Sequence, residues 1–189
     1  MSVLTPKSMM PPGLLAQIRK EAANQVQGEV ELAIRSQDLI YRDVTATDFN
    51  NGTNLGRLNN PVALVANTPA VDVFSTFTLA SFQSLVLFGI ALIGPAFAID
   101  EIQLAVGVGS SQMLAKIPLD QLYAEQDTIG YFDPVVWNPL EHVAINMLSS
   151  AGALINTETF QFLGYMGEQR GRQVNPRSYP NPAIAAGRF

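Results

Sequence analysis

The hydrophobic pattern of this chain changes its period near residue 62, and this change most constrains the fold. Beyond it, short apolar runs recur about every ten residues and are separated by Gly, Pro, Ser and Asn. Within 101–106, apolar and polar residues alternate, which is typical of a strand with one buried and one wet face. These runs predict a mainly β fold, an antiparallel and jelly-roll-like β-sandwich, and argue against a parallel α/β fold.

The most apolar segment, residues 73–99, contains no charged residue and is long enough to span a bilayer. Its first half is rich in Ser and Thr, and Gly94 and Pro95 interrupt its second half, so the apolar run shrinks to residues 85–93. A run of this length favours a strand buried on both faces. Membrane anchoring through residues 73–99 remains an alternative, although no membrane partner is expected.

The N-terminal part shows a different pattern, and no apolar signal-peptide core precedes it. After Pro11-Pro12-Gly13, apolar residues recur at spacings of three and four, which predicts an amphipathic helix that could continue to Tyr41. Turn-forming residues 48–54 then indicate a linker. We therefore expect an N-terminal helical arm and linker over 1–60 and a sandwich domain over 61–172.

Residues 173–189 are rich in Pro and Arg and predict an extended tail. Two interpretations stay open: the tail is disordered, or it docks on a neighbouring subunit whose acidic surface complements its arginines. In the second case the helix and the tail supply the partner-binding side chains. These predicted residues are Leu15, Ile18, Val26 and Val30 on the helix, with Tyr179, Ile184 and Phe189 on the tail.

The composition argues against nucleic-acid binding, against most metal sites and against most kinds of catalysis. A net charge of −5 disfavours a surface that neutralises nucleic-acid phosphates. The absence of cysteine removes thiolate metal sites and thiol nucleophiles, and a single histidine, His142, removes multi-histidine metal sites. His142 follows Glu141, but no Gly-x-Ser-x-Gly motif accompanies it, so we interpret it as a surface or hydrogen-bonded histidine. We expect no catalytic, cofactor-binding or metal-binding residue and no enzyme activity.

Two loop-rich clusters have alternative interpretations. Four carboxylates could gather a hard cation, but they do not match a calcium-loop pattern and are better explained as solvated loop residues: Asp120, Glu125, Asp127 and Asp133. Four aromatic residues could form a sugar-binding platform, although packing in the core is the simpler explanation: Tyr123, Tyr131, Phe132 and Trp137.

Several short motifs between residues 77 and 172 carry a likeness to known proteins. They are FTL at 77–79, LVLFG at 85–89, IQLAVG at 102–107, PVVWNP at 134–139, VAIN at 143–146 and FQFLGY at 160–165. In these motifs the segment resembles β-sandwich structural proteins of tailed bacteriophages.

The resemblance implies a role in the virion as a capsid decoration (cement), vertex or head–tail joining protein. Such a protein has no cofactor and binds copies of itself and major capsid or connector subunits. Two alternatives remain: a glycan- or cell-surface-binding module of a spike or fibre that uses Tyr123, Tyr131 and Trp137, and a membrane-associated virion protein.

Overall fold

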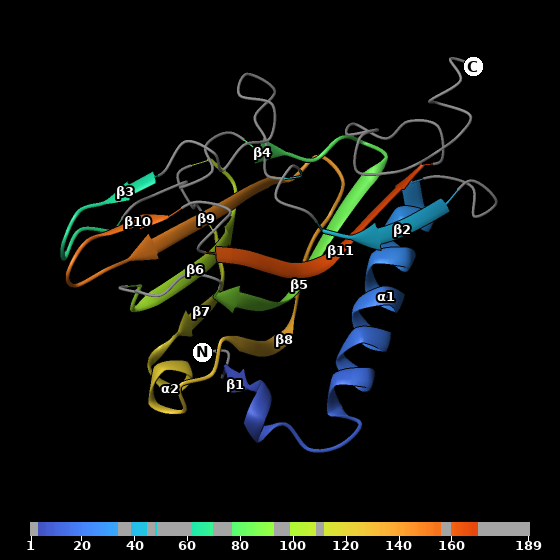
Figure 1. Cartoon of the computed structure of the whole chain (residues 1–189). Coiled ribbons are helices and arrows are strands. Elements are labelled where there is room, and N and C mark those ends of the chain that lie inside the picture. Colours follow the sequence, from blue (N-terminus) through green and yellow to red (C-terminus); the bar gives the residue numbers. More distant parts are fainter. Residues whose placement is uncertain are drawn as a thin grey trace, which may run out of the picture.

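The computed structural model describes residues 4–33, 39–44, 48, 62–69, 77–92, 99–108, 112–155 and 160–169. This part of the chain is mainly β, and its strands form antiparallel sheets (Figure 1). The predicted tail, with Tyr179, Ile184 and Phe189, lies outside the described residues.

Two sheets and a short ribbon contain the strands. The larger sheet has the order β1 (Thr5–Pro6), β8 (Ile129–Trp137), β5 (Gln83–Leu92), β11 (Phe160–Gln169) and β2 (Leu39–Asp43). The smaller sheet has the order β4 (Phe77–Thr78), β9 (His142–Leu148), β6 (Glu101–Val106) and β7 (Gln112–Pro118). The ribbon pairs β10 (Ala153–Ile155) with β3 (Val62–Leu64), and the helical elements are η1 (Lys7–Met9), α1 (Leu14–Ala33) and α2 (Asp120–Ala124).

The pairing follows one rule: the chain is folded in half between β6 and β7, and each strand of the first half pairs with its mirror strand of the second. The mirror pairs are β6–β7, β5–β8, β4–β9, β3–β10 and β2–β11, all antiparallel. Two further pairings, β5–β11 and β6–β9, connect these ribbons sideways into the two sheets. The short β1 adds to the free edge of β8.

The two sheets share one hydrophobic cluster. Leu85 and Leu87 of the larger sheet and Ile102 and Leu104 of the smaller sheet are fully buried in it. Trp137 of β8 is also fully buried, and its indole Nε1 donates a hydrogen bond of 2.8 Å to the carbonyl of Ala105 in β6. The smaller sheet therefore packs on one face of the larger sheet, and a buried hydrogen bond connects them.

Strand β5 is buried on both faces, as its uninterrupted apolar run predicted. Leu87 pairs with Gly164 and Gly89 pairs with Leu163, so Phe88 forms a bulge. Phe88 faces α1, as Val86 two positions earlier does, and the bulge shifts the alternation so that Ile90 and Leu92 face the inter-sheet cluster. At Gly164 the backbones approach so closely that an added Cβ would lie 2.1 Å from the carbonyl oxygen of Val86.

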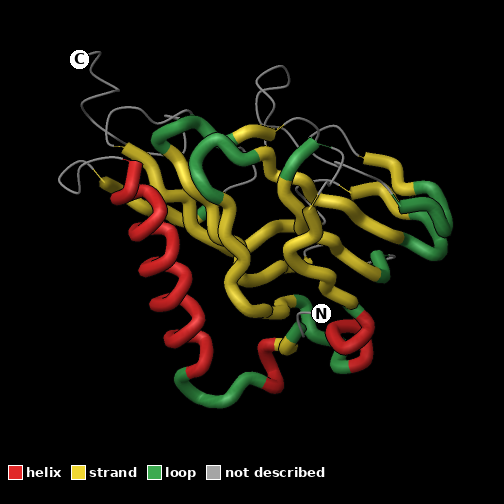
Figure 2. The backbone as a smooth tube through the Cα atoms, turned by 180° about the vertical axis from the view of Figure 1, so that it is seen from behind, coloured by secondary structure: helices red, strands yellow, loops and turns green. Residues whose placement is uncertain are grey.

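Helix α1 covers the other face of the larger sheet (Figures 1 and 2). Ala22 and Val26 are fully buried against Val86 and Phe88 of β5, and Ser84 Oγ donates a 3.1 Å hydrogen bond to the carbonyl of Val26. The helix thus packs on its own chain. The expectation that it continues to Tyr41 is wrong, because residues 39–43 form β2, whose backbone pairs with residues 165–169 of β11.

None of the described helices is long and apolar enough to cross a membrane. Of the uncharged segment 73–99, residues 83–92 belong to β5 and residues 77–78 to β4.

Candidate functional site

Among the described residues, no cluster of His, Asp and Glu could hold a metal ion. The four loop carboxylates do not converge: Asp120, Glu125 and Asp133 are exposed. Asp127 instead accepts backbone hydrogen bonds from Ser8 (2.6 Å) and Thr128 (2.8 Å). Burial acts to raise the pKa of Asp127, but the hydrogen bonds outweigh it and hold this pKa below its ordinary value. The role of Asp127 is therefore to hold the backbone of the N-terminal segment.

His142 begins β9 and is buried, and its Nδ1 lies 3.3 Å from the hydroxyl of Thr78 in β4. The neighbouring Glu141 does not orient it. The Glu141 carboxylate accepts hydrogen bonds from the backbone N–H (2.7 Å) and the side-chain amide (3.2 Å) of Asn138, and so closes the turn between β8 and β9. The histidine therefore belongs to strand packing at this end of the smaller sheet.

The aromatic cluster does not form an exposed platform. Tyr131, Phe132 and Trp137 are all buried. Tyr123 donates a 2.8 Å hydrogen bond from its hydroxyl to the carbonyl of Ile99. Burial raises the pKa of Tyr123 to about 12, and the charge of Asp100 adds to this shift. These rings therefore pack in the core or against it, as the simpler explanation of this cluster predicted.

Three of the four partner-binding residues predicted on α1 pack against their own sheet. Val26 is fully buried, and Leu15 and Ile18 are partly buried against the same cluster. The side chain of Val30 lies outside the described part. The apolar stripe that predicted a docking arm therefore packs, in its described part, against the larger sheet of the same chain.

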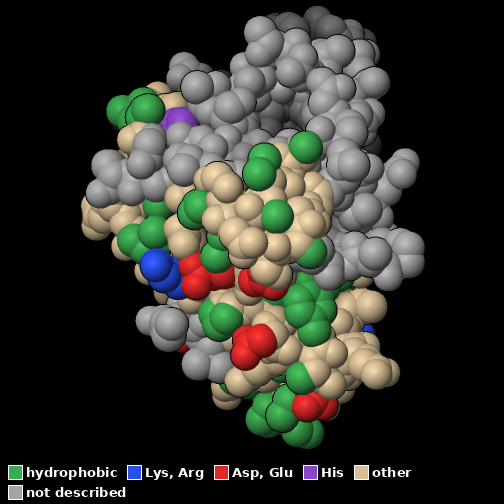
Figure 3. All heavy atoms as spheres, turned by 90° about the vertical axis from the view of Figure 1, so that its left-hand side faces the viewer, with side chains coloured by type: hydrophobic (Ala, Val, Ile, Leu, Met, Phe, Trp, Pro, Cys, Tyr) green, Lys and Arg blue, Asp and Glu red, His purple; other side chains and the backbone are tan. Residues whose placement is uncertain are grey.

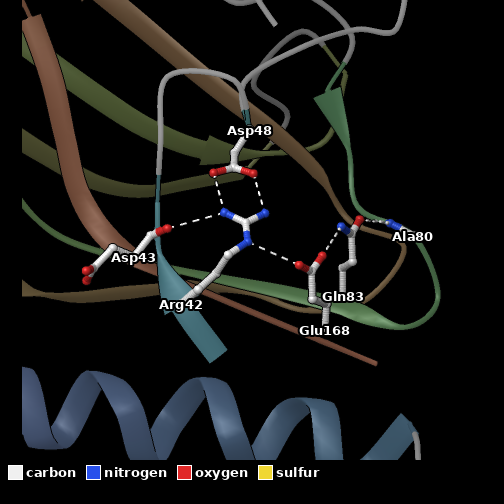
Figure 4. A network of polar contacts seen from close by, with 6 residues as sticks. All are labelled: Arg42, Asp43, Asp48, Ala80, Gln83 and Glu168. Carbon is white, nitrogen blue, oxygen red and sulfur yellow. Dashed lines mark hydrogen bonds and ion pairs between the residues drawn. The ribbon is translucent and has the colours of Figure 1, made fainter. Parts of the chain in front are cut away.

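A buried polar cluster that the sequence analysis did not predict lies where β2, β5 and β11 meet (Figure 4). The guanidinium of Arg42 binds the carboxylate of Asp48 through both terminal nitrogens, at 2.5 and 2.6 Å. Arg42 Nε donates to Glu168 at 3.1 Å, and the second oxygen of Glu168 accepts a 3.0 Å hydrogen bond from Gln83. Gln83 in turn accepts from the backbone N–H of Ala80 at 3.2 Å. We call Arg42, Asp48, Gln83 and Glu168 the arginine cluster.

The sheet register explains why the cluster is buried. Arg42 is directly opposite Met166 and Glu168 is directly opposite Gln83, and residues opposite each other or two apart share a sheet face. Met166 belongs to the cluster between the sheets, so Arg42, Gln83 and Glu168 also point to that side. The arginine cluster therefore connects three strands and the residue at position 48 at one end of the inter-sheet space.

The N-terminal strap, residues 4–10, binds at the opposite edge of the larger sheet. Leu4 is 1% exposed and lies over Gly130, where an added Cβ would be 2.8 Å from the Leu4 side chain. Thr5 and Pro6 of β1 pair with Tyr131 and Gly130. We call the receiving surface, residues 127–131, the strap seat.

Several large apolar side chains are exposed. On the edge strand β7, the pairing passes from Leu104–Ala115 to Ala105–Met113, so Leu114 is a bulge residue and both Met113 and Leu114 face solvent. Figure 3 shows hydrophobic side chains reaching the surface at separate places on the side that carries the β3–β10 ribbon, among few charged groups. Met113 and Leu114 are adjacent on an edge strand, so they are the candidates for contact with another molecule.

Comparison of the chain with protein-family models, curated proteins and solved structures finds no match.

Proposed function

We propose that this chain is a jelly-roll β-sandwich that serves as a non-enzymatic structural subunit of a virus particle. In that role it binds copies of itself and neighbouring capsid or connector subunits. The observation that carries the proposal is the mirror pairing of the strands. A long antiparallel hairpin that is rolled sideways into two facing sheets gives this pairing, and double-sheet jelly rolls form viral capsid domains as well as lectin domains.

The strand orders support the jelly-roll assignment in detail. Leaving aside β1 and the β3–β10 ribbon, eight strands remain. Along the chain, β2, β5, β8 and β11 of the larger sheet alternate one by one with strands of the smaller sheet, except at the centre, where β6 and β7 are consecutive strands of the smaller sheet. The sheet orders β8-β5-β11-β2 and β4-β9-β6-β7 place every mirror pair side by side. Two Greek keys wound on each other have this arrangement.

The side-chain chemistry also supports a structural role. Four of the ionisable residues considered above hold turns, strands or the strap through hydrogen bonds: Arg42, Asp127, Glu141 and Glu168. The glycan alternative relied on Tyr123, Tyr131 and Trp137, of which Tyr131 and Trp137 are buried. The exposed Met113 and Leu114 offer an apolar contact on a sheet edge, which suits association with another subunit.

The test is to purify virus particles from a host that produces this chain and to analyse them by density-gradient centrifugation and quantitative mass spectrometry. We expect the chain to band with the particles in a fixed ratio to the major capsid protein. Its absence from intact particles would overturn the proposal.

A variant refines the test at the β7 edge. Leu114→Glu places a charge on the exposed bulge and should reduce incorporation into particles, while circular dichroism shows a folded chain. The matched control is Gln112→Glu, which adds the same charge on the same strand without removing an apolar side chain. Equal incorporation of both variants would exclude the β7 edge as the contact.

A further inference from the structure

We infer that two copies of this chain can exchange their N-terminal straps, so that the strap of one copy docks in the strap seat of the other. The hinge at residues 11–13 sets the equilibrium between this exchanged arrangement and the one in which each strap docks in the seat of its own copy. This inference is independent of the proposed role in a virion, since it requires only that two copies meet.

The strap seat recognises the strap by three separate features. The missing side chain of Gly130 leaves the space that Leu4 fills, the edge of β8 pairs with Thr5 and Pro6, and Asp127 accepts the backbone N–H of Ser8. All three lie within residues 127–131, far from the strap along the chain. A strap from another copy would therefore find the same contacts.

The hinge is a tight turn that depends on one glycine. The N–H of Leu14 donates a 3.1 Å hydrogen bond to the carbonyl of Pro11, and Gly13 has a φ of 86°. A bond from residue four to residue one of a turn, with a positive φ at the third residue, is the pattern of a type II turn with Pro12 at its second position. The turn connects the strap to α1 of the same copy.

Opening the hinge needs a change at Gly13 alone. Met10 is already extended in the seated strap, with ψ of 127°, and the second position of a type II turn, held by Pro12, has angles close to those of an extended polyproline segment. An open hinge carries the strap away from its own seat. Two copies that exchange straps then keep every seat contact, so the hinge and the protein concentration decide which arrangement is populated.

Gly13 can be altered without touching any neighbour. An added Cβ at Gly13 has no atom within 4 Å, so Gly13→Ala acts through its φ alone. A left-handed backbone is unfavourable for alanine, and we expect the substitution to shift the equilibrium toward exchange by roughly five-fold or more for each hinge. Gly28→Ala is the matched control, because an added Cβ there also meets nothing within 4 Å while Gly28 lies inside α1.

The experiment uses the absence of cysteine in the chain. Ser8 and Thr128 are exposed, and their backbone N–H groups both bind Asp127, so a cysteine at each position can be linked by a short thiol-reactive cross-linker when the strap is seated. One preparation carries Ser8→Cys and the other carries Thr128→Cys. The two are mixed over a range of concentrations, cross-linked and analysed by mass spectrometry for the link between positions 8 and 128.

Strap exchange predicts a link between the two chains that increases with concentration, increases further with Gly13→Ala and does not increase with Gly28→Ala. Gly130→Val, which fills the space for Leu4 in every copy, should abolish the link. A chain carrying both cysteines reports the seated strap within one copy. If this double variant links only within single chains, and the mixed preparations give no link even with Gly13→Ala at the highest concentration, the inference is refuted.

Discussion

Replacing Arg42 by Met tests whether the arginine cluster stabilises the sheet end. The substitution keeps an unbranched side chain of similar length but removes the charge and every donor. It leaves the carboxylates of Glu168, which is 0% exposed, and Asp48, which is 6% exposed, without the guanidinium that binds both.

The magnitude follows from this burial. Removing one partner of a buried ion pair costs about 3–5 kcal/mol, because a charge remains in a medium that solvates it poorly. Domains unfold with a free energy of about 5–15 kcal/mol, so the loss is a large share of the total. For a chain of this size it corresponds to a melting temperature lower by about 6–20 °C.

The assay is urea unfolding followed by the fluorescence of Trp137, the single tryptophan, which is fully buried. Lys20→Met is the control, because it removes a cation from the exposed surface of α1 and should change stability by less than about 0.5 kcal/mol. The triple variant Arg42→Met, Asp48→Leu, Glu168→Met should recover most of the loss, since it leaves no buried charge in the cluster. If Arg42→Met shifts the unfolding midpoint no more than Lys20→Met, the reasoning fails.

Three further predictions concern single positions. Leu140 has a φ of 69° and an exposed side chain, so Leu140→Gly should raise the unfolding free energy by about 1 kcal/mol in the same urea assay; a lower midpoint would show that the side chain contributes contacts. Gly164→Ala should prevent stable folding, because its Cβ would overlap the carbonyl of Val86, and a normal yield of folded protein would contradict the close approach of the two strands. The lowered pKa of Asp127 stabilises the fold above the ordinary carboxyl pKa of 3.8, and this contribution is lost as the pH falls through the lowered value. Asp127→Asn should therefore be less stable than the parent at pH 7 but not in strong acid, and a difference that does not depend on pH would exclude the charge as its cause.

The strands with a regular burial pattern were predictable from the sequence. The alternation at 101–106 corresponds to β6, and the apolar run 85–93 corresponds to most of β5. In each case burial on one or both faces leaves a periodic or continuous apolar pattern, which is a local signal. The helix over 14–33 has the same kind of signal.

The features that the sequence analysis missed depend on distant partners. Residues 39–41 are apolar enough to extend the helical pattern, and only pairing with β11 makes them a strand. Asp48 lies among turn-forming residues and Glu168 precedes a basic stretch, so neither position carries the apolar pattern of a core residue. Their burial depends on Arg42, which is 126 positions from Glu168, and no local pattern carries that information.

The strap was missed for a different reason. A two-residue strand such as β1 is too short to show a period, and Leu4 is buried through the shape of Gly130 rather than through a pattern of its own. A short segment that adds to a sheet edge can therefore be identified only once the structure of the sheet that it binds is known.

The mirror pairing also determines at which point during synthesis the two sheets can form. The β6–β7 pair joins neighbours in the chain, and each pair toward the ends closes a longer loop, up to β2–β11, which joins residues 39–43 to residues 165–169. A ribosome releases β5, with apolar side chains on both faces, well before β8 and β11 exist to cover its edges. Such non-local pairing slows folding and leaves partly folded, aggregation-prone intermediates with exposed apolar surface. The yield of folded protein in a cell should therefore depend on chaperones and on a low growth temperature, even if the native state is stable.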